Sequence, residues 1–151
     1  MRYRLWVPAL LLLAGCSDAT GPGDQHALLQ QNLALWSRRG PADYQFTITR
    51  ICECLPETAG PVLIEVRDGQ VNDRRYDSGA AVSPQYDDLF RPIPGLFDLI
   101  SQALETPAAA LSVRYNRRYG YPESIQIDWV AGVVDDEVSY RVDGFVPLAG
   151  F

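Results

Sequence analysis

VLIEVRDGQVNDRRY, residues 62–76, is the segment that decides the fold, because it predicts two strands and the turn between them. Apolar and polar side chains alternate over residues 62–67, and residues 70–76 form the second strand. Asp68-Gly69 between them is typical of a two-residue hairpin turn, in which both positions need positive φ. Because a tight hairpin joins neighbouring strands that run in opposite directions, the sequence predicts an antiparallel sheet.

Patterns on either side of this hairpin predict the remaining elements. Alternation predicts further strands at residues 44–49, 111–115, 124–130 and 137–145. Helical spacing of apolar residues predicts a helix over residues 25–39, with Asp24 as its N-cap and Gly40-Pro41 at its end. A second helix is expected over residues 94–105, after a polar loop over residues 77–92.

The order of these elements is α-βββ-α-βββ, which predicts one α+β domain. We expect an antiparallel sheet of about six strands, covered on one face by the two helices, with a mostly polar face toward water. The two halves share a plan, which suggests a duplicated unit.

The first fifteen residues have the three parts of a secretory signal peptide. Arg2 and Arg4 supply positive charge, residues 5–13 form an apolar run, and two small residues precede Cys16. The run is too short for a membrane-spanning helix, which needs about 20 residues. The ending LAGC, residues 13–16, resembles the lipobox of bacterial lipoproteins, which implies acylation of Cys16 and cleavage just before it. The alternative is an ordinary cleaved signal followed by a chance cysteine.

This interpretation divides the chain into a signal peptide (1–15), a lipidated tether (16–24) and one globular domain (25–151). Cleavage removes two of the 13 arginines, so 11 arginines face 19 acidic residues and the net charge becomes −8. An acidic domain without a basic cluster should not bind nucleic acid or anionic lipid electrostatically. We therefore expect a cell-envelope lipoprotein held by the lipid on Cys16, without a cofactor. Ser17 after the cysteine favours the outer membrane where a cell has two.

Cys52 and Cys54 remain as a pair in an oxidising compartment once Cys16 carries lipid. Alternate Cβ atoms of a flat strand lie roughly 6 Å apart, whereas a disulfide needs about 3.8 Å. A bond between these two thiols therefore predicts a turn or bulge at this point. The alternatives are a redox-active dithiol, in which Arg50 would lower a thiol pKa, a soft-metal site, a disulfide-linked dimer, and reduced buried cysteines.

Four acidic residues cluster around the last predicted hairpin. Their oxygen atoms suit calcium, although their spacing fits no EF-hand. The alternative is a solvated hairpin loop in which the first of them caps a turn or pairs with an arginine. These residues are Asp128, Asp135, Asp136 and Glu137.

The segment YNRRYGYP, residues 115–122, joins two predicted strands and is rich in tyrosine and arginine. Both residue types are enriched at binding hot spots, so we expect a candidate recognition loop here. The alternative is a long hairpin whose tyrosines lie back over the sheet, with Gly120 and Pro122 shaping the turn. The recognition loop consists of Tyr115, Arg117, Arg118, Tyr119 and Tyr121.

Signatures of catalysis are lacking in the sequence. His26 is the only histidine, and we expect it to be solvated at the entry to the first helix. Its isolation argues against Ser-His-Asp and Cys-His arrangements. The chain has no nucleophile-elbow, zinc-protease, P-loop or dinucleotide-binding motif. Paired carboxylates could still cleave glycosides, but no pair stands out. We therefore expect no enzyme.

From Trp36 to about Pro147 the chain resembles an uncharacterised family of small bacterial lipoproteins, defined by a domain of unknown function. The resemblance implies a place in the cell envelope and brings no activity. The helix-plus-strands plan is also similar to PepSY-type and small periplasmic inhibitor domains, which is a likeness of fold alone. The matching features are Trp36, Tyr44-Gln45-Phe46, Cys52-Glu53-Cys54, residues 66–71, residues 96–100, Tyr119-Gly120-Tyr121-Pro122, residues 125–128, Asp135-Asp136-Glu137 and Tyr140.

The sequence thus predicts a tethered, non-enzymatic lipoprotein that binds a partner in the cell envelope. The exposed sheet face and the recognition loop are the expected contact surfaces. The alternative is a redox- or metal-handling lipoprotein that uses Cys52 and Cys54.

Overall fold

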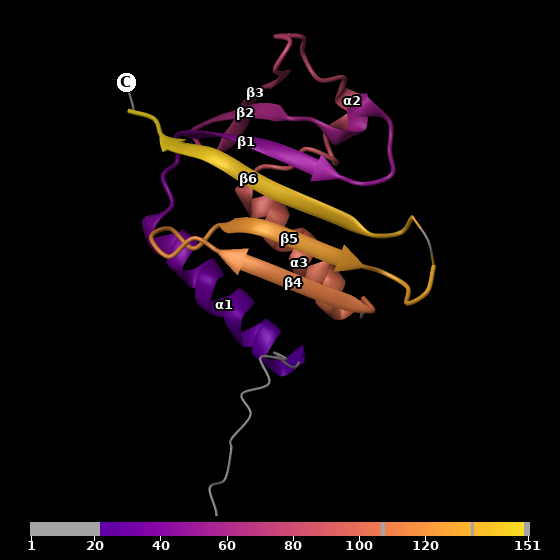
Figure 1. Cartoon of the computed structure of the whole chain (residues 1–151). Coiled ribbons are helices and arrows are strands. Elements are labelled where there is room, and N and C mark those ends of the chain that lie inside the picture. Colours follow the sequence, from indigo (N-terminus) through magenta and orange to yellow (C-terminus); the bar gives the residue numbers. More distant parts are fainter. Residues whose placement is uncertain (1–21, 107, 134, 150–151) are drawn as a thin grey trace, which may run out of the picture.

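The computed structural model describes residues 22–106, 108–133 and 135–149. Within these residues the chain is an α+β domain with one antiparallel six-stranded sheet and three α-helices (Figure 1). The elements in chain order are α1 (Pro22–Arg39), β1 (Tyr44–Ile51), α2 (Pro56–Ala59), β2 (Val62–Arg67), β3 (Gln70–Tyr76), a 3-10 turn (Pro84–Tyr86), α3 (Ile93–Glu105), β4 (Ala110–Tyr115), β5 (Pro122–Asp128) and β6 (Val138–Pro147).

Helix α1 begins earlier than the sequence pattern predicts. It starts at Pro22, so the end of the predicted tether is helical and Asp24 lies in the first turn rather than at the N-cap. A carboxylate there still favours the helix, because the N-terminal end of the helix dipole is positive. The predicted signal peptide and Cys16 lie outside the described residues. Among those described, no helix has the length and apolar character needed to cross a membrane.

The sheet has the strand order β3-β2-β1-β6-β5-β4, and every neighbouring pair is antiparallel. The two hairpin-linked halves meet where β1 pairs with β6, with Ile48 opposite Val142. Across the sheet each half contributes its strands in the same order, from its third strand to its first, with β1 central and β4 at the edge (Figure 1). The duplicated unit stays a prediction.

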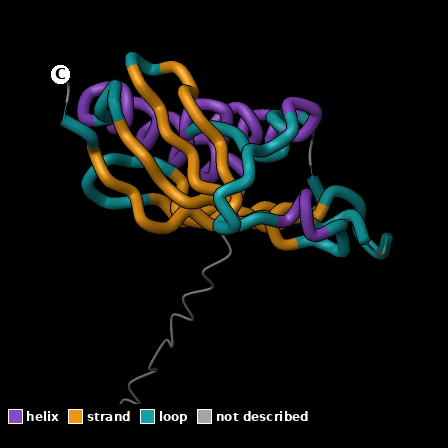
Figure 2. Tube along the Cα trace, turned by 90° about the horizontal axis from the view of Figure 1, so that it is seen from above, coloured by secondary structure: helices purple, strands orange, loops and turns teal. Residues whose placement is uncertain are grey.

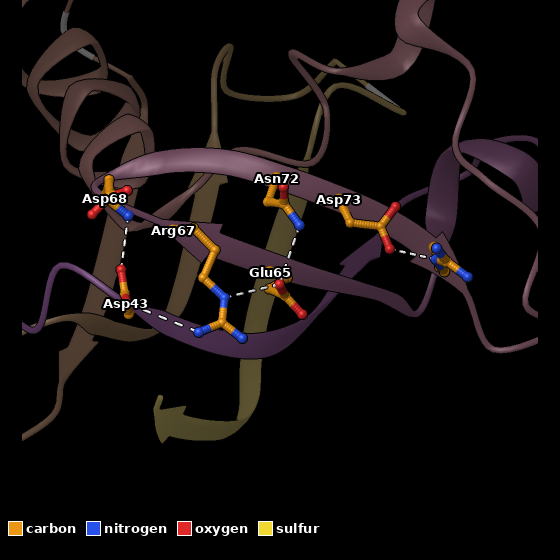
Figure 3. Close-up of polar contacts among 7 residues, drawn as sticks. Asp43, Glu65, Arg67, Asp68, Asn72 and Asp73 are labelled. Carbon is orange, nitrogen blue, oxygen red and sulfur yellow. Dashed lines mark hydrogen bonds and ion pairs between the residues drawn. The ribbon is translucent and has the colours of Figure 1, made fainter. Parts of the chain in front are cut away.

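The hairpin of residues 62–76 forms as predicted. Asp68 has φ 49° and Gly69 has φ 73°, as a turn with two positive φ values requires. The loop before β1 holds this turn, since the Asp68 backbone N donates to Asp43 Oδ1 at 2.7 Å (Figure 3). The Gly69 backbone N also donates to the Ala42 carbonyl at 3.0 Å. These two hydrogen bonds therefore link the hairpin turn to the loop before β1.

The core forms on one face of the sheet. In β1 the side chains of Tyr44, Phe46 and Ile48 are buried, while the alternating polar residues are half-buried on the other face. The apolar stripe of α3 contributes Ile93, Leu96, Phe97 and Ile100 to the same cluster. Helix α3 contacts β5 and α1, and Figure 2 shows the long helices as a layer beside the sheet.

Two short helical segments were not predicted. Helix α2 follows the cysteine pair, and the 3-10 turn lies within the predicted polar loop. Both begin at a proline, whose fixed φ suits a helical first position. The loop is also less polar than expected, because Val82 and Phe90 insert into the core.

Candidate functional site

Asn116 organises the loop between β4 and β5. Its backbone N donates to the Tyr121 carbonyl at 2.8 Å, and its own carbonyl accepts from the Gly120 N at 2.8 Å. Its side-chain Oδ1 accepts from the backbone N of Arg118 at 3.0 Å and of Tyr119 at 2.9 Å. The loop is therefore held in one conformation by its own first residue. An asparagine whose side chain accepts from the backbone two or three residues further on is a known turn signal, and it could have indicated this role from the sequence.

Gly120 brings the loop into contact with α1. Its φ is +85°, and a Cβ there would lie 2.5 Å from the Asn32 carbonyl oxygen and 3.0 Å from Leu35 Cβ. Only a residue without a side chain can take this conformation at this distance from a helix. The contact joins segments that are almost ninety residues apart in the chain (Figure 1).

The tyrosines of the recognition loop pack against the core. The Tyr121 ring is stacked on Phe145 with centroids 4.5 Å apart and meets Trp36 edge-on at 6.3 Å. The Tyr119 ring lies 5.3 Å from Phe145. Tyr115 is stacked on Phe97 at 6.3 Å. These rings lie back over the sheet, so they join α1, α3 and β6 instead of projecting into solvent as hot-spot tyrosines do.

Arginines form the exposed part of the loop. Arg117 and Arg118 are exposed, and neither guanidinium forms an ion pair with a described residue. Arg118 lies over the Tyr119 ring at 5.0 Å, a cation–π distance. A hollow of about 490 Å³ opens beside them, which we call the arginine hollow. It is lined by Arg114, Tyr115, Asn116, Arg117, Arg118 and Glu123.

The walls of the arginine hollow already hold one carboxylate. Glu123 Oε2 lies 3.6 Å from Arg114 Nε, and Glu123 Oε1 accepts from Asn116 Nδ2 at 2.9 Å. The hydroxyl of Tyr115 is buried and has no hydrogen-bond partner within the described part of the chain. Burial raises the pKa of Tyr115 to about 12, so the phenol is neutral at physiological pH.

The end of α1 adds more positive charge beside this loop. Arg39 Nη1 donates to the Arg118 carbonyl at 3.5 Å, and Arg38 precedes it in the last turn of α1. The spacing of arginines along the sequence predicts no basic cluster. The fold gathers one, because it places the C-terminal end of α1 against the β4–β5 loop.

The structure joins Cys52 and Cys54 by a disulfide, in a bend just after β1. The Cα atoms are 5.3 Å apart, which lies within the usual range for a disulfide. The Cys54 backbone N also donates to the Cys52 carbonyl at 2.9 Å, which closes the turn that the sequence analysis required. In this oxidised form the two sulfur atoms are bonded to each other.

Replacing both cysteines with serine is expected to lower the free energy of unfolding by only about 1.6 kcal/mol or less. The closed loop is very short, and a cross-link that closes a shorter loop removes less entropy from the unfolded chain and so stabilises the folded state less. Urea denaturation of the wild-type and Cys52→Ser/Cys54→Ser proteins measures the difference. A loss of several kcal/mol would show that the bond does more than close a local turn.

The four acidic candidates do not come together as a metal site. No group of three or more His, Cys, Asp or Glu residues that could hold a metal ion occurs in the ranges described. Asp135 and Glu137 are exposed. Asp128 Oδ1 and both carboxylate oxygens of Asp136 are buried, without a hydrogen-bond partner among the described atoms. The described acidic residues therefore do not form the candidate calcium site. His26, the single histidine of the sequence, is exposed on α1.

Comparison with known proteins gives one result. Neither the curated proteins nor the solved structures contain a match to this chain. A family described as a family of unknown function, DUF6174, matches residues 28–147, which include the disulfide, the recognition loop and all six strands. This match confirms the resemblance to a domain of unknown function and brings no activity with it. The chain therefore belongs to the DUF6174 family.

Proposed function

We propose that this protein is an exported, lipid-anchored binding module of the cell envelope that is not an enzyme. It holds a partner through the arginines of the recognition loop and the exposed face of the sheet. The observation that carries this proposal is the pair Arg117 and Arg118, which are exposed and unpaired with any described residue on a loop fixed by Asn116. A preorganised loop loses little conformational entropy when a partner binds.

The outer sheet face is suited to a reversible contact. We infer that α1 and α3 cover the opposite face, since Trp36 packs edge-on to Tyr44 at 5.4 Å and α3 contacts β5. The outward side chains are short, polar or ion-paired, as with Arg141 and Asp143 at 2.9 Å. Such a surface resembles the polar rim of an interface more than an obligate dimer contact. On the central strands and the neighbouring β4 and β5, this face comprises Thr47, Thr49, Ser112, Gln126, Ser139 and Arg141.

The proposed anchor keeps the domain near a membrane. Helix α1 begins at Pro22, only a few residues after the proposed acylated Cys16. Stable anchoring needs two membrane-binding signals, such as two acyl chains, which the resemblance to bacterial lipoproteins implies for this cysteine. The recognition loop lies at the other end of α1, so it would face away from the anchor (Figure 1).

Site-specific photo-crosslinking in intact cells tests this function. A photo-reactive amino acid at position 117 or at Gln126 on the outer face should give a discrete adduct with an envelope protein. The same group at Asp98, which is exposed on α3, is the matched control and should give none. Cys16→Ser should move the protein from the membrane to the soluble fraction and reduce the adduct strongly.

Two results would contradict the proposal. One is the absence of any adduct at both test positions, or an identical adduct pattern at Asp98. The other is a native protein that begins at Met1 without lipid, because the compartment and the tethered role would then both be wrong.

A further inference from the structure

We propose that the arginine hollow binds the carboxylates of an acidic segment in the partner protein. This inference rests on the proposed function and names the chemistry that its partner must present. It is carried by the carboxylate already held in the hollow, by the arginines left without an ion pair, and by the rigidity of the loop.

Glu123 shows that the hollow accommodates a carboxylate. Arg114 and Asn116 hold its two oxygens from one side, at 3.6 and 2.9 Å. This ion pair offsets the charge of Arg114, whose side chain is 69% exposed. Arg117 and Arg118 have no comparable partner among the described residues, so the hollow keeps an excess of positive charge on a domain that is acidic overall.

Arginine is suited to this ligand. Its planar guanidinium donates two parallel hydrogen bonds to one carboxylate, and such charge-assisted pairs are among the stronger hydrogen bonds in proteins. Tyr115 also lines the hollow, and the stacking of its ring on Phe97 fixes it in place. Because Asn116 and Gly120 fix the loop backbone, only the arginine side chains have to become ordered on binding.

The position of the hollow favours a protein over the phosphates of the anchoring membrane. Helix α1 has 18 residues, and a rise of 1.5 Å per residue makes it about 27 Å long. The chain to the proposed anchor leaves the N-terminal end of α1, whereas Arg39 at the C-terminal end contacts Arg118. The screening length at physiological ionic strength is about 8 Å, so a membrane surface at the anchored end would attract these arginines little.

Titration of the full-length protein in detergent with poly-L-glutamate tests the inference, with isothermal calorimetry as the readout. Arg117→Glu/Arg118→Glu should weaken binding at least about tenfold, since it replaces two attractions by repulsion. Arg75→Glu/Arg91→Glu is the matched control, because it changes the net charge equally at β3, on the opposite edge of the sheet from β4, and in the loop before α3. That control should change the Kd by less than about threefold. Arg117→Lys/Arg118→Lys keeps the charge but loses the planar fork, and should fall between the two.

Three outcomes would overturn the inference. They are no binding of poly-L-glutamate by the wild-type protein, equal weakening in both charge-reversal variants, and binding to phosphatidylglycerol vesicles or inorganic phosphate in preference to poly-L-glutamate. Thermal unfolding of each variant shows whether it is folded. If these tests fail while the photo-adduct at position 117 still forms, the inference is wrong and the proposed function stands. Loss of the adduct at both position 117 and Gln126 would remove the proposed function itself.

Discussion

Gly120→Ala should lower the free energy of unfolding by about 3 kcal/mol, one of the two largest effects expected for a single residue of this protein. Two costs add at this position. A residue with a Cβ at φ +85° pays roughly 1–2 kcal/mol, and a Cβ placed 2.5 Å from the Asn32 carbonyl oxygen forces the loop or α1 to move. Because the obstructing atom belongs to the helix backbone, a side-chain rotation cannot relieve the contact.

Gly79→Ala is the matched control for this prediction. Gly79 has φ +83°, almost the same as Gly120, but nothing lies within 4 Å of its Cβ position. It should therefore show the conformational cost alone, about 1 kcal/mol. Urea denaturation followed by tryptophan fluorescence measures both variants, since Trp36 lies in the affected region. Equal losses in the two variants would show that the close approach to α1 contributes nothing to stability.

Tyr121→Ala should be similarly costly, at about 3–5 kcal/mol, the range for removing a large aromatic side chain from a core. Tyr121 is 7% exposed and contacts both Phe145 and Trp36, so its removal leaves a cavity between α1 and the sheet. Tyr121→Phe keeps the ring and loses only the hydroxyl, which is 3.4 Å from Asn116 Nδ2. That variant should lose no more than about 1 kcal/mol.

Thermal and urea unfolding of the two Tyr121 variants, with Arg117→Ala beside them, separates stability from binding. Exposed Arg117 should tolerate alanine within about 0.5 kcal/mol. A binding defect of Tyr121→Ala would then reflect loss of the fold, whereas a defect of Arg117→Ala would reflect loss of a contact. A stable, well-folded Tyr121→Ala protein would contradict the place given to this ring in the core.

Local patterns predicted most of the secondary structure. Residues 62–76 predicted a hairpin with two positive φ values, and Asp68 and Gly69 have them. The apolar stripe of the second long helix predicts burial of Ile93, Leu96, Phe97, Ile100 and Leu104, and all of these are buried except Leu104, which is partly buried. These signals succeed because strand alternation, turn chemistry and helix periodicity depend on residues only a few positions apart.

The same patterns failed where neighbours in the chain did not decide the outcome. Alternation predicted the strands of both halves, but it could not predict that β1 pairs with β6, because that pairing joins segments far apart in the chain. The loop of residues 77–92 was expected to be polar, yet Val82 and Phe90 enter the core. Single apolar residues in a loop carry no periodicity, so their burial follows from the space that the other elements leave open.

The recognition loop shows where sequence patterns end and packing begins. The composition of residues 115–122 indicated a recognition loop rich in tyrosine and arginine. It did not indicate which of these side chains are buried and which are exposed. The folded chain separates them, with the tyrosines turned to the core and Arg117 and Arg118 to solvent. That division depends on Gly120 meeting Asn32 and on Arg39 reaching Arg118, contacts between segments that are distant in the chain. Burial of aromatic surface against α1 drives such contacts, and no local spacing encodes which distant surface will be available.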